Sequence, residues 1–217
     1  MDERDELAAV AREDESPRVR KAAVSKLMDP AVLALIARED ADTGVRAQAA
    51  SMLRDIALEA FEETGEPESL AAVDALTDSK ILAHVAKTAT RESVARQALS
   101  RLTDVRALGS VARHAALEPI RLSAFASVDD HDELLAVAMH SEFKDTAAAA
   151  VDRLDDRTDL EHIAAGSNNR AAVKRARTIL RERDERAAEE AAALAPPPSD
   201  QDDMQRAREL EARRLEE

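Results

Sequence analysis

The stretch Leu7-Ala8-Ala9-Val10-Ala11-Arg12-Glu13-Asp14 returns 26 residues later as Leu33-Ala34-Leu35-Ile36-Ala37-Arg38-Glu39-Asp40. The leading leucine recurs along the chain, with Val or Ile three residues later and Ala directly after. These leucines are Leu7, Leu33, Leu82, Leu108, Leu134 and Leu160. Self-similarity at a short fixed period is typical of chains built from stacked supersecondary units.

A second apolar stripe begins twelve residues after each leucine. It starts at Val19, Val45, Val94, Ile120, Thr146 and Ala172, and two further apolar residues follow at spacings of four. Spacings of three and four place side chains on one face of a helix. Each unit is therefore expected to form a helix A and a helix B. Of seven units, the third keeps only its second half, at Glu68, Ala72 and Leu76.

This pattern predicts an all-α fold, an α-α superhelix of about seven stacked helix pairs over residues 1–183, with one degenerate pair. The side chains expected in its core include Leu33, Ile36, Leu53, Leu108, Val111 and Leu154. The aspartates expected to cap the A helices are Asp29, Asp78, Asp104, Asp130 and Asp156. Asp55 has the same register but no turn residue follows it, so we expect one helix over residues 45–62, broken by Gly65-Glu66-Pro67.

Composition agrees with thin helical layers. Aromatic residues make up 1% of the 217 residues and charged residues 35%. The absence of cysteine excludes disulfides and thiolate metal sites. The first residues, Met1-Asp2-Glu3-Arg4-Asp5-Glu6, lack the features of a secretory signal, and no apolar run is long enough to span a bilayer. A cytoplasmic location without membrane association is therefore expected.

Three segments are expected beyond the repeats. Residues 184–195 are rich in Ala and Glu and predict a charged helical extension. Residues 196–203 begin with three prolines and predict a semi-rigid linker. Residues 204–217 have the apolar spacing of a short amphipathic helix.

The repeated motif resembles HEAT-like repeats of the short bacterial type. Glu39-Asp40-Ala41-Asp42-Thr43-Gly44-Val45-Arg46 is the nearest match to that pattern. The basic helix at Arg170-Ala171-Ala172-Val173-Lys174-Arg175-Ala176-Arg177 and the charged extension after it are similar to the N-terminal repeat half of some large bacterial helical proteins of unknown function. The resemblance implies a solenoid whose B helices line a concave face, and it implies no activity.

No constellation of catalytic residues stands out. The five histidines are spread over several units, and a metal ion needs several ligands converging at about 2.0–2.2 Å. A glycine-rich phosphate loop and a nucleophile elbow are absent from the sequence. We therefore expect no catalytic residues, no metal and no cofactor, and we expect a binding protein instead of an enzyme.

Basic residues gather in the B helices, although the net charge is −14. Arg20, Arg46 and Arg121 follow the first apolar residue of their helices, where pairing with a loop acid such as Asp14, Asp40 or Glu118 would explain them structurally. The candidate partner-binding residues are the cations outside that position: Lys21, Lys26, Arg96, Arg101, Arg153 and Lys174. Lys26, Arg101 and Arg153 share one register and are expected to point the same way.

The expected partner is another protein held on the concave face. The alternative is nucleic acid or an acidic protein segment bound along a basic groove, for which binding must weaken steeply with salt. A third possibility is that the cations only form structural pairs with acids, because a field of one sign focuses a ligand only where no counter-charge is near. The sequence leaves the oligomeric state open.

Overall fold

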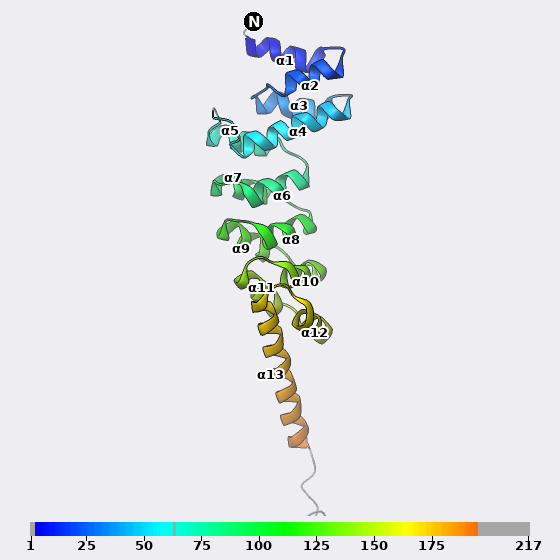
Figure 1. Cartoon of the computed structure of the whole chain (residues 1–217), viewed down its shortest axis with the longest axis vertical. Helices are drawn as coiled ribbons and strands as arrows, with labels where there is room; N and C mark the ends of the chain where they lie inside the picture. The colour runs from blue at the N-terminus through cyan, green and yellow to red at the C-terminus, as the bar shows by residue number, and fades with distance from the viewer. Residues whose placement is uncertain (1–2, 63, 195–217) are drawn as a thin grey trace, which may run out of the picture. The chain divides into compact units, whose positions relative to one another are not determined.

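The structure is a computed structural model that describes residues 3–62 and 64–194 (Figure 1). These residues form thirteen α-helices and no strand, which confirms the all-α prediction. The helices are α1 (Glu3–Glu13), α2 (Pro17–Val24), α3 (Pro30–Glu39), α4 (Thr43–Ala57), α5 (Glu66–Ala75), α6 (Ser79–Thr88), α7 (Glu92–Ser100), α8 (Val105–His114), α9 (Glu118–Ala126), α10 (His131–His140), α11 (Lys144–Asp152), α12 (Arg157–Gly166) and α13 (Arg170–Leu194). The expected linker at 196–203 and helix at 204–217 lie outside the described residues.

The chain divides into two compact regions between Arg177 and Thr178, so the division falls inside α13. In the first region, the A helices α1, α3, α6, α8 and α10 each pack against the B helix that follows them, as α3 does on α4 and α8 on α9. Helices of one kind also pack on the next of their kind: α6 on α8 and α8 on α10 among the A helices, and α5 on α7 and α7 on α9 among the B helices. In Figure 1, α8, α10 and α12 lie on one side of this region, with α9 and α11 on the other.

Backbone hydrogen bonds join successive units at one recurring position. The N–H groups of Ala116 and Asn168 each donate, at 3.1 Å, to a carbonyl oxygen in the last turn of the preceding A helix, at Lys87 and Met139. Glu142 donates in the same way to Arg113 at 3.3 Å. The loop between helices A and B thus satisfies carbonyl groups that the end of the preceding A helix leaves without a helical partner.

All five aspartates expected to cap A helices do so. Asp29, for example, accepts hydrogen bonds from the Ala31 N–H at 2.8 Å and the Val32 N–H at 3.2 Å. The other four are Asp78, Asp104, Asp130 and Asp156. These caps stabilise the helix starts because the first N–H groups of a helix lack a backbone acceptor.

The third unit lacks a separate helix A. The expected helix over residues 45–62 was too long, because α4 ends at Ala57. Glu59 takes a left-handed backbone with a φ of 55°, and the Ala60 N–H donates to the Asp55 carbonyl oxygen at 2.9 Å. This is the hydrogen-bond pattern of a Schellman helix end, which usually needs glycine. Helix α5 then packs directly on α3 and α4.

The predicted core is largely observed. Leu33, Ile36, Leu53, Val111 and Leu154 are buried. Leu108 is only half-buried, so its predicted burial was wrong. The buried side of α8 consists of Ala107, Gly109, Val111 and Ala112, which leaves Leu108 at its edge. Gly109 lies so close to the Glu133 carboxylate of α10 that a Cβ there would meet its oxygen at 2.0 Å.

Candidate functional site

The six candidate cations fall into two groups by register. Lys21, Arg96 and Lys174 each lie fourteen residues after the leucine of their unit, on α2, α7 and α13, and all three are exposed. The residues at the same register in the other units are also exposed or half-exposed. We call the seven residues at this register the outer row: Lys21, Ala47, Leu70, Arg96, Leu122, Ala148 and Lys174. The row therefore places three cations among four apolar side chains on the B helices.

Arg101 and Arg153 belong to the second group and face the preceding unit. Arg101 donates to the Val73 carbonyl oxygen of α5 at 3.0 Å and also to that of Asp74. Arg153 donates to the Phe125 carbonyl oxygen of α9 at 3.2 Å and to the Asp129 carboxylate at 2.8 Å. Each arginine thus caps the C-terminal end of the preceding B helix, where a cation is favourable.

Arg101 and Arg153, which were candidates for partner binding, therefore have partners within the fold. Their carbonyl partners lie 28 residues earlier in the chain, in the unit next to their own. Lys26 has the same register but belongs to the first unit. No described helix precedes that unit, and the Lys26 side chain is exposed.

The arginines at the Val-Arg position are held by the loop before their own helix. Arg20 and Arg46 each donate to the carbonyl oxygen six residues earlier, at 2.8 Å to Asp14 and 2.6 Å to Asp40. Arg121 does the same to Ala115 at 3.1 Å. The partner of this position is thus mainly a backbone carbonyl, and the expected pairing with Asp14 or Glu118 through the carboxylate is not what the structure shows.

Arg20 in addition forms a two-point ion pair with Asp40 of the next unit, with both nitrogen–oxygen distances at 2.8 Å. The Arg20 side chain is 11% exposed and that of Asp40 is 5% exposed. The hydrogen bond from Arg20 lowers the pKa of the Asp40 carboxyl group. A guanidinium with two parallel bonds to a carboxylate is a strong and geometrically specific pair, so it fixes the first unit to the second.

Arg121 reaches the next unit by another route. Its guanidinium stacks over the Phe143 ring, 3.5 Å from the centroid. Its Nε donates to the Thr146 hydroxyl at 3.2 Å. The Arg121 side chain is buried, so these contacts stabilise the packing of unit five on unit six instead of offering a cation to a ligand.

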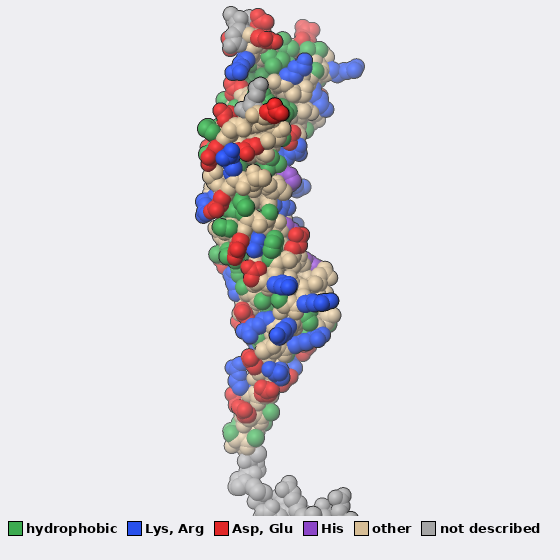
Figure 2. Space-filling model, turned by 60° about the vertical axis from the view of Figure 1, so that its left-hand side comes forward, with side chains coloured by type: hydrophobic (Ala, Val, Ile, Leu, Met, Phe, Trp, Pro, Cys, Tyr) green, Lys and Arg blue, Asp and Glu red, His purple; other side chains and the backbone are tan. Residues whose placement is uncertain are grey.

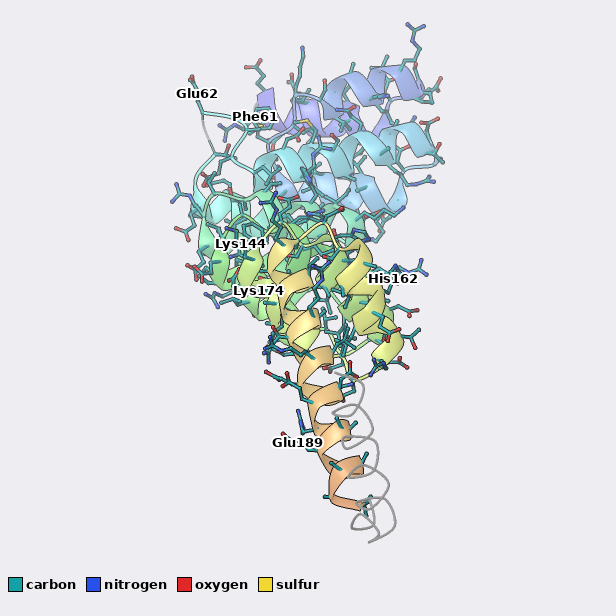
Figure 3. The ribbon with its side chains drawn as sticks, turned by 60° about the horizontal axis from the view of Figure 1, so that its bottom comes forward. Phe61, Glu62, Lys144, His162, Lys174 and Glu189 are labelled. Carbon is teal, nitrogen blue, oxygen red and sulfur yellow. The ribbon has the colours of Figure 1, made fainter. Side chains whose placement is uncertain are left out.

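Charges on the described surface are mixed in sign. Figure 2 shows Lys and Arg side chains interspersed with Asp and Glu over most of the face in view. Figure 3 places Lys144 of α11 and Lys174 of α13 on one side of the last described units, with His162 of α12 on the other. The helix-B side therefore carries the exposed outer-row cations, whereas Arg101 and Arg153 are directed to the preceding unit.

Two of the five histidines contact carboxylates of the next unit. His114 Nδ1 lies 2.8 Å from Glu142 Oε1, and His131 Nε2 lies 2.6 Å from Asp159 Oδ2. The contact with Asp159 raises the pKa of His131, whereas burial lowers the pKa of His84. Within residues 3–62 and 64–194, no three His, Asp or Glu side chains gather as a metal site.

In that same part of the chain, no helix combines the length and apolar character needed to cross a bilayer.

One set of contacts was missed by the sequence reasoning. On α7, Ser93, Gln97 and Arg101 form a stripe at spacings of four, and all three bond back to α5. The spacing itself was a usable signal, because three polar residues on one helical face point in one direction.

No protein-family model matches the chain, and no curated protein matches it.

Proposed function

We propose that the chain is a HEAT-like solenoid, a non-enzymatic scaffold that binds another protein along the outer row. The observation that supports this most directly is the division of the candidate cations by register. Arg101 and Arg153 are used between units, whereas Lys21, Arg96 and Lys174 are exposed at one repeated position. Such repeated positions on stacked helices give an extended binding surface.

The outer row fits a protein segment that carries both acidic and apolar side chains. Its cations are separated by Ala47, Leu70, Leu122 and Ala148. Leu122 is 43% exposed, so its side chain is accessible for an apolar contact. Apolar contacts give affinity, and three spaced cations select acidic partners and favour their approach.

Nucleic acid is the weaker candidate for the same surface. Binding to a duplex depends on many Lys and Arg side chains that neutralise phosphates. The outer row has three cations among seven residues, and the net charge of the chain is −14. An acidic, partly apolar protein segment therefore fits the surface better.

The test compares two triple variants with the same change in charge. The first reverses the outer row by Lys21→Glu, Arg96→Glu and Lys174→Glu. The control reverses exposed cations on the A helices, by Arg38→Glu, Lys80→Glu and Arg106→Glu. We expect the wild-type chain and the control to capture the same proteins from a cell lysate and the outer-row variant to lose them.

Equal capture by both variants would place the binding surface elsewhere. Fluorescence anisotropy with a labelled DNA duplex and a labelled single-stranded RNA tests the alternative. Tight binding that falls steeply between about 50 and 200 mM salt, and that the outer-row variant loses, would favour nucleic acid over protein.

A further inference from the structure

Helices α6 and α8 carry positive charge in a chain whose net charge is −14. Neither helix contains an aspartate or a glutamate, and each contains two Lys or Arg residues and one histidine. The two helices pack on each other as neighbouring A helices (Figure 1). Residues 79–114 hold seven Lys and Arg residues against two acids, Glu92 and Asp104. The middle of the chain therefore differs in charge from the chain as a whole.

The cations of α6 and α8 lie at positions that recur from one unit to the next. Lys80 and Arg106 each lie two residues before the leucine of their unit, and both are exposed. His84 and Lys87 follow Lys80 at spacings of four and three, which place the three side chains on one side of α6. We call Lys80, His84, Lys87 and Arg106 together the basic patch.

The charges of the basic patch are not used within the fold. Among the residues that the structure describes, Lys80, Lys87 and Arg106 form no ion pair with a carboxylate. Lys87 Nζ instead donates to the neutral Ser110 hydroxyl of α8 at 3.0 Å. Arg113 of α8 is left out of the patch because Glu133 pairs with it at 2.8 Å. Three cations are thus available to an anionic ligand.

His84 lies between Lys80 and Lys87 on α6 and responds to the positive charge around it. Burial lowers the pKa of His84 most, and the charges of Arg54 on α4 and of Lys87 lower it further, against a smaller opposite effect of Asp55. An anion bound beside His84 would oppose these charges and raise that pKa. The histidine therefore reports on whether the patch is occupied.

The residue types favour a nucleic-acid backbone over a protein as the ligand. The registers of Lys80, His84 and Lys87 hold Arg106, Ser110 and Arg113 on α8, so all six positions are polar. Protein interfaces have an apolar core, which the outer row offers with its Leu and Ala side chains and these positions do not. Phosphates are bound by Lys and Arg through charge.

The same two helices favour a duplex over a single strand. Proteins that bind single strands stack the bases on aromatic side chains, and neither α6 nor α8 contains an aromatic residue. Lys80 and Lys87 are about 10 Å apart along α6, and the axes of neighbouring helices lie about 8–10 Å apart. Successive phosphates of one duplex strand advance about 3.4 Å, so the patch spans about three of them.

We propose that the basic patch binds the phosphate backbone of a double-stranded nucleic acid without reading its sequence. Asp132 and Glu133 of α10 limit the patch on one side, because Asp132 has the register of Lys80 and Arg106. The proposal does not depend on the outer row, which lies on the B helices. Three neutralised phosphates predict that binding weakens about 40-fold between about 50 and 200 mM salt.

Charge reversal tests the proposal. The patch variant is Lys80→Glu with Arg106→Glu, and the control is Lys21→Glu with Arg96→Glu in the outer row, which changes the net charge equally. In fluorescence anisotropy with a labelled DNA duplex of about 20 base pairs at about 50 mM salt, the patch variant should bind about tenfold more weakly or worse, and the control within about twofold of the wild type. Circular dichroism shows that both variants are folded.

An NMR titration locates the contact. Addition of the duplex should raise the pKa of His84 in the wild type and in the control alike. A wild-type chain that does not bind the duplex, equal losses in both variants, or an unmoved His84 overturns the proposal. So does poly-glutamate that competes as well as the duplex at equal charge, which would assign the patch to an acidic protein segment. The patch variant should still capture the proteins that the outer-row variant loses, which separates this proposal from the proposed function.

Discussion

The Arg101 side chain of α7 donates a hydrogen bond to the Val73 carbonyl oxygen of α5 at 3.0 Å and so closes the end of a helix that belongs to the preceding unit. Arg153 makes the equivalent bond to Phe125 two units further on. A single side chain thus links two successive B helices by adding a charged donor to a carbonyl oxygen in the last turn of the preceding helix. Positions of this kind contribute to the nearest-neighbour stability of repeat proteins.

The first prediction compares Arg101→Ala with Arg96→Ala on the same helix. Arg101→Ala should lower the free energy of unfolding by about 1–2 kcal/mol, because two carbonyl groups lose a charged donor. Arg96 forms an exposed pair with Glu92 within α7, and its loss should cost less than about 0.5 kcal/mol. Urea unfolding followed by circular dichroism measures both, and equal losses would contradict the capping role.

The second prediction concerns leucines at one register. Leu82 is 2% exposed and Leu108 is half-buried, although both open the apolar pattern of their units. Leu82→Ala should cost about 2–5 kcal/mol, as is usual for a core leucine. Leu108→Ala should cost clearly less, because less apolar surface leaves the core. The same urea series decides the order, and a larger loss for Leu108 would show that α8 packs differently.

Local signals made much of this fold predictable. Leucine spacing located the helix faces, and aspartates in front of the A helices gave their starts, as Asp29 and Asp78 show. Both signals act within a few residues, so they can be interpreted without knowing the neighbours. The end of α4 was different, because Glu59 is a non-glycine residue in a left-handed conformation. The residue type of Glu59 gives no signal that the helix ends there.

The candidate site was less predictable for a related reason. Lys26, Arg101 and Arg153 were recognised as one register, but the register alone does not say whether a side chain faces solvent or the preceding unit. Arg101 and Arg153 find their partners 28 residues away, across the contact between units. Only the packing of one B helix on the next decides this direction.

The third prediction is a pH dependence of the pair between Arg20 and Asp40. The folded pKa of Asp40 is lowered, so the pair stabilises the fold above the unfolded carboxyl pKa of about 3.9 and loses that effect as the pH falls through the folded pKa. Asp40→Asn should therefore lower stability at neutral pH, and its difference from the wild type should shrink below about pH 4.

Glu39→Gln is the matched control for that series. Glu39 pairs with Arg38 at 2.8 Å, but the Glu39 side chain is 57% exposed. Its loss should change the thermal midpoint little at any pH, because exposed pairs contribute little. A difference between Asp40→Asn and wild type that stays constant from pH 7 to about pH 2 would show that the charge of Asp40 is not what matters.

The last prediction orders two histidines by their titration. The hydrogen bond to Asp159 raises the pKa of His131 above 6.5, whereas burial lowers the pKa of His84 below that value. On lowering the pH, His131 should therefore gain its proton first in a two-dimensional NMR titration. Asp159→Asn should move the pKa of His131 back toward its ordinary value and leave the pKa of His84 unchanged. The contact with Asp159 is the largest cause of the His131 shift, whereas Asp159 does not contribute to the shift of His84. A reversed order would mean that the contact between α10 and α12 does not form in solution, since that contact holds His131 against Asp159.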